Sequence, residues 1–142
     1  MSTEDNKAAV HRLFDGLNQH DVAIVDELCT SDFVLHDPAG PGGWRGDGIN
    51  SPQEYQEYLS GFFASLPGQF TIDDMIAEGD KVVVRWTYRS THQGEWRGVS
   101  PTSKEVTFTA TATYRFGHGK VAEIWQNVDN LGVLKQLGLY QA

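Results

Sequence analysis

The feature that most constrains the fold is the strict alternation of apolar and polar residues in two long runs. In residues 105–116 (EVTFTATATYRF) every even position is apolar or aromatic, and every odd position is Thr, Glu or Arg. Residues 81–92 (KVVVRWTYRSTH) place Val82, Val84, Trp86 and Tyr88 at even positions in the same way. Because successive side chains on a strand point to opposite faces, the even positions form one buried face. The sequence therefore predicts long antiparallel strands that are covered on one side.

The N-terminal half has helical periodicity. An amphipathic helix is expected from Thr3 to about Asn18, and a short second helix after Asp21. Residues 32–37 read as a brief strand that Pro38 ends. Ser51, followed by Pro52 and Glu54, begins a third helix with an aromatic stripe. Further strands are expected at 70–77 and 81–92, and a short helix at 131–137. This order predicts an α+β domain in which helices pack on one sheet face.

Length and charge limit the function. The 142 residues predict a single domain, 1–142, and the net charge of -8 with a pI near 4.9 disfavours nucleic acid and anionic membranes as partners. The single cysteine, Cys29, provides no disulfide framework. The acidic N-terminus does not resemble a signal peptide, and no apolar run is long enough to span a membrane. We therefore expect a cytoplasmic protein.

The last strand candidate, residues 121–129, carries a polar stripe at alternate positions: Trp125, Asn127 and Asp129. Apolar periodicity alone would turn this stripe outward. A two-residue hairpin loop at 118–119 would instead turn it onto the buried face, and Gly119 suits the positive φ of such a turn. A three-residue loop would reverse the result. The pairs expected from the two-residue loop are Tyr114 with Glu123, Ala112 with Trp125, Ala110 with Asn127 and Phe108 with Asp129.

Several segments together resemble the SnoaL-like polyketide cyclases of the nuclear transport factor 2-like superfamily. They are residues 91–104 (THQGEWRGVSPTSK), 114–116 (YRF), 119–121 (GKV) and 123–125 (EIW) with Asp129. The resemblance implies a cone-shaped barrel, in which three N-terminal helices pack on a strongly curved, mainly antiparallel sheet that encloses a hydrophobic pocket. It also implies a homodimer formed through the outer sheet face.

The resemblance further implies a cofactor-independent enzyme of the cyclase, isomerase or lyase type. Such an enzyme would carry out aldol-type cyclisation or isomerisation of a small apolar molecule with a carbonyl group. By position Asp129 resembles the aspartate that takes the proton, although an Asp before a helix also serves as an N-cap. His36 and His92 are expected to assist, unless they are satisfied structural histidines.

The substrate-binding residues expected beside these are aromatic, amide or small: Trp125, Asn127, Trp86, Tyr88, Tyr58, Phe62, Trp44, Phe108 and Ala112. Metal ligands at suitable spacing and glycine-rich phosphate loops are absent from the sequence, so we expect no metal and no cofactor. Two alternatives stay open. One is epoxide opening, in which Asp129 would act with Asp37 or Asp73. The other is a non-catalytic domain for small-molecule binding or dimerisation.

Overall fold

A computed structural model describes residues 2–40 and 48–140 of the chain and contains four helices in this part. They are α1 (Thr3–Asn18), α2 (Ile24–Leu28), α3 (Pro52–Ser65) and α4 (Asn130–Gln136). The cap residues behave as expected from sequence. The Ser51 hydroxyl accepts a hydrogen bond from the Glu54 N–H (3.1 Å), and Pro52 occupies the first turn, where its missing N–H costs nothing.

Within the described ranges, five strands form one mixed sheet in the order β1-β5-β4-β3-β2. Their bounds are β1 (Cys29–His36), β2 (Gly68–Glu78), β3 (Lys81–Thr91), β4 (Glu105–Gly117) and β5 (Lys120–Val128). Only β1 runs parallel to its neighbour, β5. The even positions of β3 and β4 are buried, as the alternation predicts.

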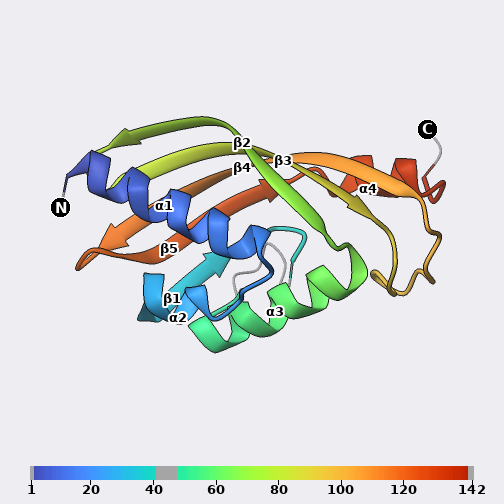
Figure 1. Cartoon of the computed structure of the whole chain (residues 1–142), viewed down its shortest axis with the longest axis horizontal. Coiled ribbons are helices and arrows are strands. Elements are labelled where there is room, and N and C mark those ends of the chain that lie inside the picture. The colour runs from blue at the N-terminus through green and yellow to red at the C-terminus, as the bar shows by residue number, and fades with distance from the viewer. Residues whose placement is uncertain (1, 41–47, 141–142) are drawn as a thin grey trace.

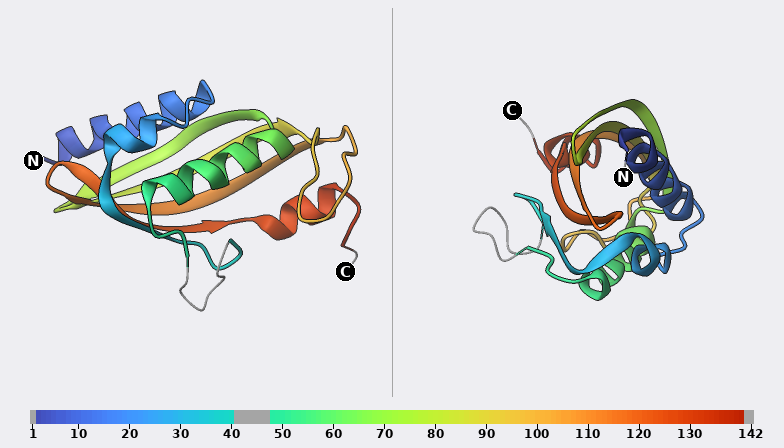
Figure 2. Two further views of the ribbon diagram at one scale, coloured as in Figure 1. Left: turned by 90° about the horizontal axis from the view of Figure 1, so that it is seen from below. Right: turned by 90° about the vertical axis from the view of Figure 1, so that its left-hand side faces the viewer.

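The sheet is strongly curled but not closed, because β1 and β2 form its two edges (Figures 1 and 2). Helices α1 and α3 lie across the open side of the curl, and α4 sits at the end where β5 finishes (Figure 2). The inner face and the helices enclose an aromatic core in which Phe70 contacts Phe14, Trp86 and Tyr88. The predicted α+β cone is thus confirmed, and it carries a fourth helix at its C-terminal end.

The predicted register between β4 and β5 is wrong beyond its first two pairs. Gly117 pairs with Lys120 and Phe116 with Val121, as a two-residue loop requires, but Arg115 then pairs with Glu123. Ala122 is therefore the extra residue of a β-bulge, and every pair after it is shifted by one. The pairs observed in place of the predicted ones are Tyr114 with Ile124, Thr113 with Trp125, Ala112 with Gln126 and Thr111 with Asn127.

The shift reverses the faces of β5. Trp125 and Asn127 lie on the outer, threonine-rich face, and the side chain of Trp125 is 37% exposed. Ile124 is fully buried, and Gln126 takes the inward position beside it. A hairpin with a regular loop can still contain a bulge, and one extra residue is enough to turn all later side chains over.

Candidate functional site

The interior of the cone contains a pocket with a free volume of about 60 Å³. Its walls are mainly aromatic and come from α1, α3, β2, β3, β4 and the 96–97 turn. The aromatic lining residues are Phe14, Tyr55, Tyr58, Phe62, Phe70, Trp86, Trp96, Phe108 and Tyr114. Aliphatic residues complete the wall, among them Leu59 from α3 and Val133 from α4. Such a surface suits a flat, largely apolar ligand.

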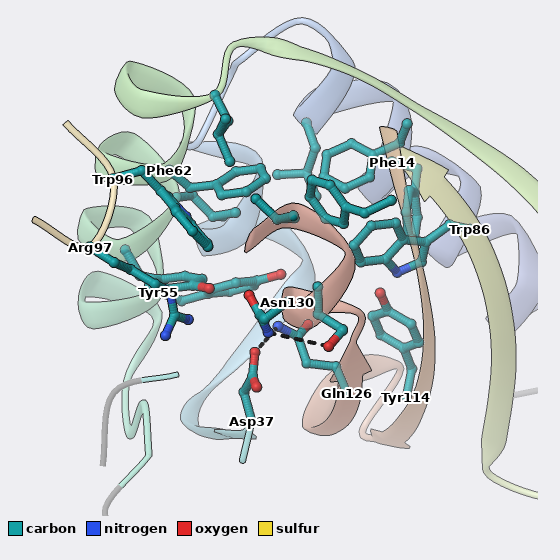
Figure 3. A pocket seen from close by; sticks show the side chains of 18 residues that line it. Phe14, Asp37, Tyr55, Phe62, Trp86, Trp96, Arg97, Tyr114, Gln126 and Asn130 are labelled. Carbon is teal, nitrogen blue, oxygen red and sulfur yellow. Dashed lines mark hydrogen bonds between the residues drawn. The ribbon is translucent and has the colours of Figure 1, made fainter. Parts of the chain in front are cut away.

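One end of the pocket is polar, and Asp37 is its centre (Figure 3). The Asp37 side chain lies just beyond β1, is only 4% exposed, and accepts hydrogen bonds from two donors. Its Oδ2 accepts from Gln126 Nε2 (2.8 Å), and its Oδ1 accepts from the Ala39 N–H (2.9 Å). These bonds compensate for the cost of burying a carboxylate and hold it in one orientation.

The sheet register explains why Asp37 and Gln126 meet. His36 pairs with Trp125 across the parallel β1-β5 ladder, and both side chains lie on the outer face. The next residue on each chain therefore points inward. Gln126 donates its amide N–H to the Asp37 carboxylate across the inner face of this ladder. Asn130 also lines this end and donates Nδ2 to the Val128 carbonyl (3.2 Å).

Tyrosine hydroxyls are the donors of the pocket. In the described part of the chain, the hydroxyl groups of Tyr55, Tyr58 and Tyr114 have no protein acceptor, and all three residues line the cavity. Burial raises the pKa of each, and for Tyr58, where the negative charge of Asp37 adds to it, the pKa is about 12. All three therefore stay protonated at neutral pH and can donate a hydrogen bond to a ligand oxygen.

Asp129 lies outside the lining of the pocket. Its side chain is exposed, and its Oδ1 accepts a hydrogen bond from the Gly132 N–H (2.9 Å), which makes it the N-cap of α4. The observed geometry matches the capping role that the sequence also allowed. Asn127 and Trp125 lie on the outer face and do not line the cavity either.

The two histidines also lie away from the pocket. His36 Nε2 is 2.7 Å from Glu123 Oε2, and the His36 ring stacks on Trp125 on the outer face. Glu123 also accepts a bond from Arg115 Nε (3.0 Å). Burial opposes the charge of Glu123, but the bonds from His36 and Arg115 outweigh it and lower the pKa of Glu123.

His92 is fully buried and forms hydrogen bonds that hold the loop between β3 and β4 in place. Its Nδ1 accepts a hydrogen bond from the Thr102 N–H (3.2 Å), and its backbone pairs with Ser103 and Lys104. Nδ1 is thus an acceptor, so Nε2 carries the proton, and this N–H has no partner among the described residues. His92 is absent from the pocket lining.

The remaining predicted binding residues divide by position. Tyr58, Phe62, Trp86 and Phe108 line the pocket. Tyr88 lies behind the wall and donates its hydroxyl to the Leu66 carbonyl (2.6 Å). Ala112 is buried in the sheet opposite Gln126. Trp44 falls outside the described residues.

Sequence reasoning missed the polar end of the pocket, although the signals for it exist. Phe33, Leu35 and Asp37 share one parity, so the buried face of β1 leads directly to the carboxylate. Likewise Gln126 shares the parity of Ile124 and Val128, which the apolar pattern of β5 assigns to the interior. A two-residue loop without a bulge would reverse this assignment, and the bulge at Ala122 restores it.

The curled α+β cone around an aromatic pocket with a polar end is a fold of the nuclear transport factor 2-like type. Comparison with known proteins identifies the family within this fold. The profile of the SnoaL-like polyketide cyclases matches residues 7–137, and the chain belongs to that family.

Solved structures agree with this membership. AclR from Streptomyces galilaeus, a proposed hydroxylase, has a TM-score of 0.86 at 26% identity, covering 99% of this chain and 100% of its own. IdmH from Streptomyces antibioticus, a proposed polyketide cyclase, has a TM-score of 0.80 at 27% identity, covering 93% and 97%. A proposed polyketide cyclase from Acidithiobacillus ferrooxidans has a TM-score of 0.83 at 27% identity, covering 97% and 98%.

Curated proteins give no significant match to the sequence. Among the described residues, no helix is long and apolar enough to cross a membrane, and no group of three or more His, Cys, Asp or Glu side chains is placed to hold a metal ion.

Proposed function

We propose that this protein is a cofactor-independent acid/base enzyme that catalyses aldol-type cyclisation or isomerisation of an apolar, carbonyl-bearing small molecule. The observation that carries the proposal is the buried carboxylate of Asp37 at the polar end of an aromatic pocket. Family membership supports the reaction class. The tight hydrogen bonds from Gln126 and Ala39 support the role of Asp37, since a catalytic base needs a defined position.

In this mechanism the Asp37 carboxylate removes a proton from the carbon next to the substrate carbonyl. The electron pair of the broken C–H bond moves into the enolate, whose oxygen receives a hydrogen bond from a tyrosine hydroxyl. For cyclisation, the enolate carbon attacks a second carbonyl of the same molecule and forms the new C–C bond. The resulting alkoxide takes back the proton held by Asp37. For isomerisation, Asp37 returns the proton to a different carbon of the enolate.

The tyrosines suit the electrophilic part of this proposal. Tyr55, Tyr58 and Tyr114 remain protonated because burial raises their pKa, so they donate rather than repel a developing negative charge. A hydrogen bond that strengthens as the enolate forms stabilises the transition state more than the bound ketone.

Paired carboxylates, which epoxide opening would use, are not brought together in the described pocket. Asp37 is the carboxylate of its lining. Asp73 accepts a bond from Thr87 at the protein surface, and Asp129 caps α4. We therefore favour single-base chemistry over epoxide opening.

The test compares two isosteric substitutions, Asp37→Asn and Asp129→Asn. Aromatic ketones are incubated with each protein in deuterated water, and exchange of the α-proton is followed by NMR, together with ring closure by mass spectrometry. Loss of a general base predicts that Asp37→Asn is slower by about two to four orders of magnitude. Asp129→Asn keeps a side-chain acceptor for Gly132 and should retain the wild-type rate.

The possible outcomes distinguish Asp37 from Asp129 as the base, and an enzyme from a carrier. If only Asp129→Asn loses activity, the base is the residue that the family resemblance suggested, and our assignment of Asp37 is wrong. If the ketones bind without any exchange or turnover in the wild-type protein, the domain is a carrier rather than an enzyme. Incorporation of labelled oxygen from water into an epoxide-derived product would favour epoxide opening instead.

We also propose that two copies associate through the outer sheet face. Residue pairing aligns Ile76, Val83, Thr113 and Trp125 in one row across β2, β3, β4 and β5. Ile76 in this row is 67% exposed, and Trp125 is 37% exposed. Large apolar side chains that are exposed on a sheet face are typical of a surface that is covered in an assembly.

A further inference from the structure

A second hollow, an outer groove, adjoins the pocket and has a free volume of about 450 Å³. It is lined by Ala39, Gly40, Glu57, Tyr58, Gly61, Phe62, Ser65, Trp96 and Arg97. Four of these residues also line the inner pocket: Tyr58, Phe62, Trp96 and Arg97. The groove is therefore the approach to the pocket, and a ligand that fills the pocket can extend into it.

Arg97 stands at the junction of groove and pocket, next to Trp96 (Figure 3). Its guanidinium carbon lies 5.2 Å from the Trp96 ring centre, and its Nη2 donates to the Ala39 carbonyl (2.6 Å). A guanidinium group has five N–H donors, and this is its one hydrogen bond within the described part of the chain. The guanidinium group can therefore still offer two parallel N–H donors on one edge to a ligand.

The backbone holds Arg97 there at a conformational cost. Trp96 and Val99 exchange two backbone hydrogen bonds (3.0 and 2.8 Å), which closes a two-residue turn over Arg97 and Gly98. Both turn residues have positive φ, 50° for Arg97 and 82° for Gly98. Asn-Gly is the preferred sequence for such a turn, and arginine is unfavourable at its first position. Strain of this kind is common where a side chain must be presented to a ligand.

The charges of the groove select the ligand class. Among the described residues of the lining, Glu57 on α3 is the other side chain with a full charge, so the positive and negative charges of this described lining balance. Together with the net charge of -8, this disfavours phosphates and other polyanions. A single carboxylate matches one bidentate edge of Arg97, and the aromatic rings beside it suit a planar skeleton.

We propose that the outer groove binds a carboxylate carried by the aromatic substrate, with Arg97 as the residue that recognises it. The aromatic part of the ligand lies against Trp96 and Phe62, its carbonyl enters the pocket towards Asp37, and its carboxylate stays at the mouth. This deepens the proposed function because it names the charge of the substrate, but its test measures binding and does not depend on turnover.

The test uses 2-naphthoate and its methyl ester as a matched pair of probes in isothermal titration calorimetry. The wild-type protein should bind the acid at least about tenfold more tightly than the ester, as expected for a charge-assisted bidentate contact that is partly open to solvent. Arg97→Asn should abolish this preference and leave ester binding unchanged. Asparagine is well accommodated at this turn position, so the variant should melt within a few degrees of the wild type.

Arg89→Gln is the matched control, because it also removes one positive charge but lies on β3 at a position of the outer sheet face. It should keep the full preference for the acid. Equal binding of acid and ester by the wild type, binding of neither probe, or an equal loss for both variants would overturn the proposal. An unchanged preference in Arg97→Asn would overturn it as well. A purely structural role for Arg97 predicts that Arg97→Asn loses thermal stability and weakens acid and ester alike.

Discussion

The bulge at Ala122 leads to a prediction about two single-residue deletions in β5. Ala122 has no partner of its own in β4, since Phe116 pairs with Val121 and Arg115 with Glu123. Deleting Ala122 would leave a regular hairpin in which all observed pairs remain. We expect a loss of at most about 1 kcal/mol from the altered twist. For a domain of 142 residues this lowers the melting temperature by roughly 3–5 °C.

Deleting Trp125 should be far more costly. If the bulge is kept, Gln126 moves to the outer face and the shorter Asn127 takes its inward position, so the observed bond to Asp37 is lost. Val128 also turns away from the pocket wall, and each change costs about 1–3 kcal/mol. Helix α4 is also pulled back by about 3.3 Å. Its buried Val133 and the following Leu137 then lose contacts worth about 1.5–3 kcal/mol each.

The other response to the Trp125 deletion is to straighten the bulge. That keeps Gln126 opposite Ala112, but it moves the fully buried Ile124 to the outer face and the Glu123 carboxylate into the core. Burying an unpaired carboxylate costs several kcal/mol, so straightening the bulge does not avoid the loss of stability. A loss of roughly 5 kcal/mol or more would consume most of the stability of a typical domain.

Thermal unfolding followed by circular dichroism measures both deletions. Trp125→Ala is the control that removes the indole without changing the register, and it should melt close to the Ala122 deletion. Equal losses for the two deletions, or a larger loss for the Ala122 deletion, would refute the assignment of Ala122 as the bulge residue.

Two further predictions concern the pocket tyrosines and the outer face. Burial favours the neutral phenol and raises the pKa of Tyr58 from 10.0 to about 12. The protonated phenol therefore contributes fully to the free energy of unfolding below pH 10, and this contribution is lost as the pH rises towards 12. Urea unfolding at pH 9 and pH 11 should show this loss, and Tyr58→Phe should reduce it; an identical loss in both proteins would contradict the cause. Ile76→Glu should convert the proposed dimer to a monomer in light scattering, with pocket binding retained, whereas a monomeric wild-type protein would exclude this interface.

The local elements were predictable because their signals lie in neighbouring residues. The Ser51-Pro52 start of α3 depends on one helical turn, and the buried faces of β3 and β4 follow from alternation within each strand. Family-specific segments such as residues 91–104 were sufficient to predict the cone. None of these inferences requires knowledge of contacts between distant residues.

The site was predicted only in part. Trp86, Phe108, Tyr58 and Phe62 were expected to line the pocket, and they do so because their positions follow from strand and helix periodicity. The polar end depends on a single inserted residue in β5. A one-residue shift moves every later side chain of a strand to the opposite face. The register predicted without the bulge at Ala122 therefore placed Trp125 and Asn127 on the inner face, whereas they lie on the outer face.

The sequence by itself therefore determined the α+β class, the buried strand faces and the aromatic character of the cavity, because these depend on periodic patterns along the chain. Only the tertiary structure decided which carboxylate enters the pocket. Asp37 and Gln126 are far apart in sequence, and the parallel pairing of β1 with β5 joins them. The bulge turns Gln126 inward, and the start of α4 leaves Asp129 at the surface as a helix cap.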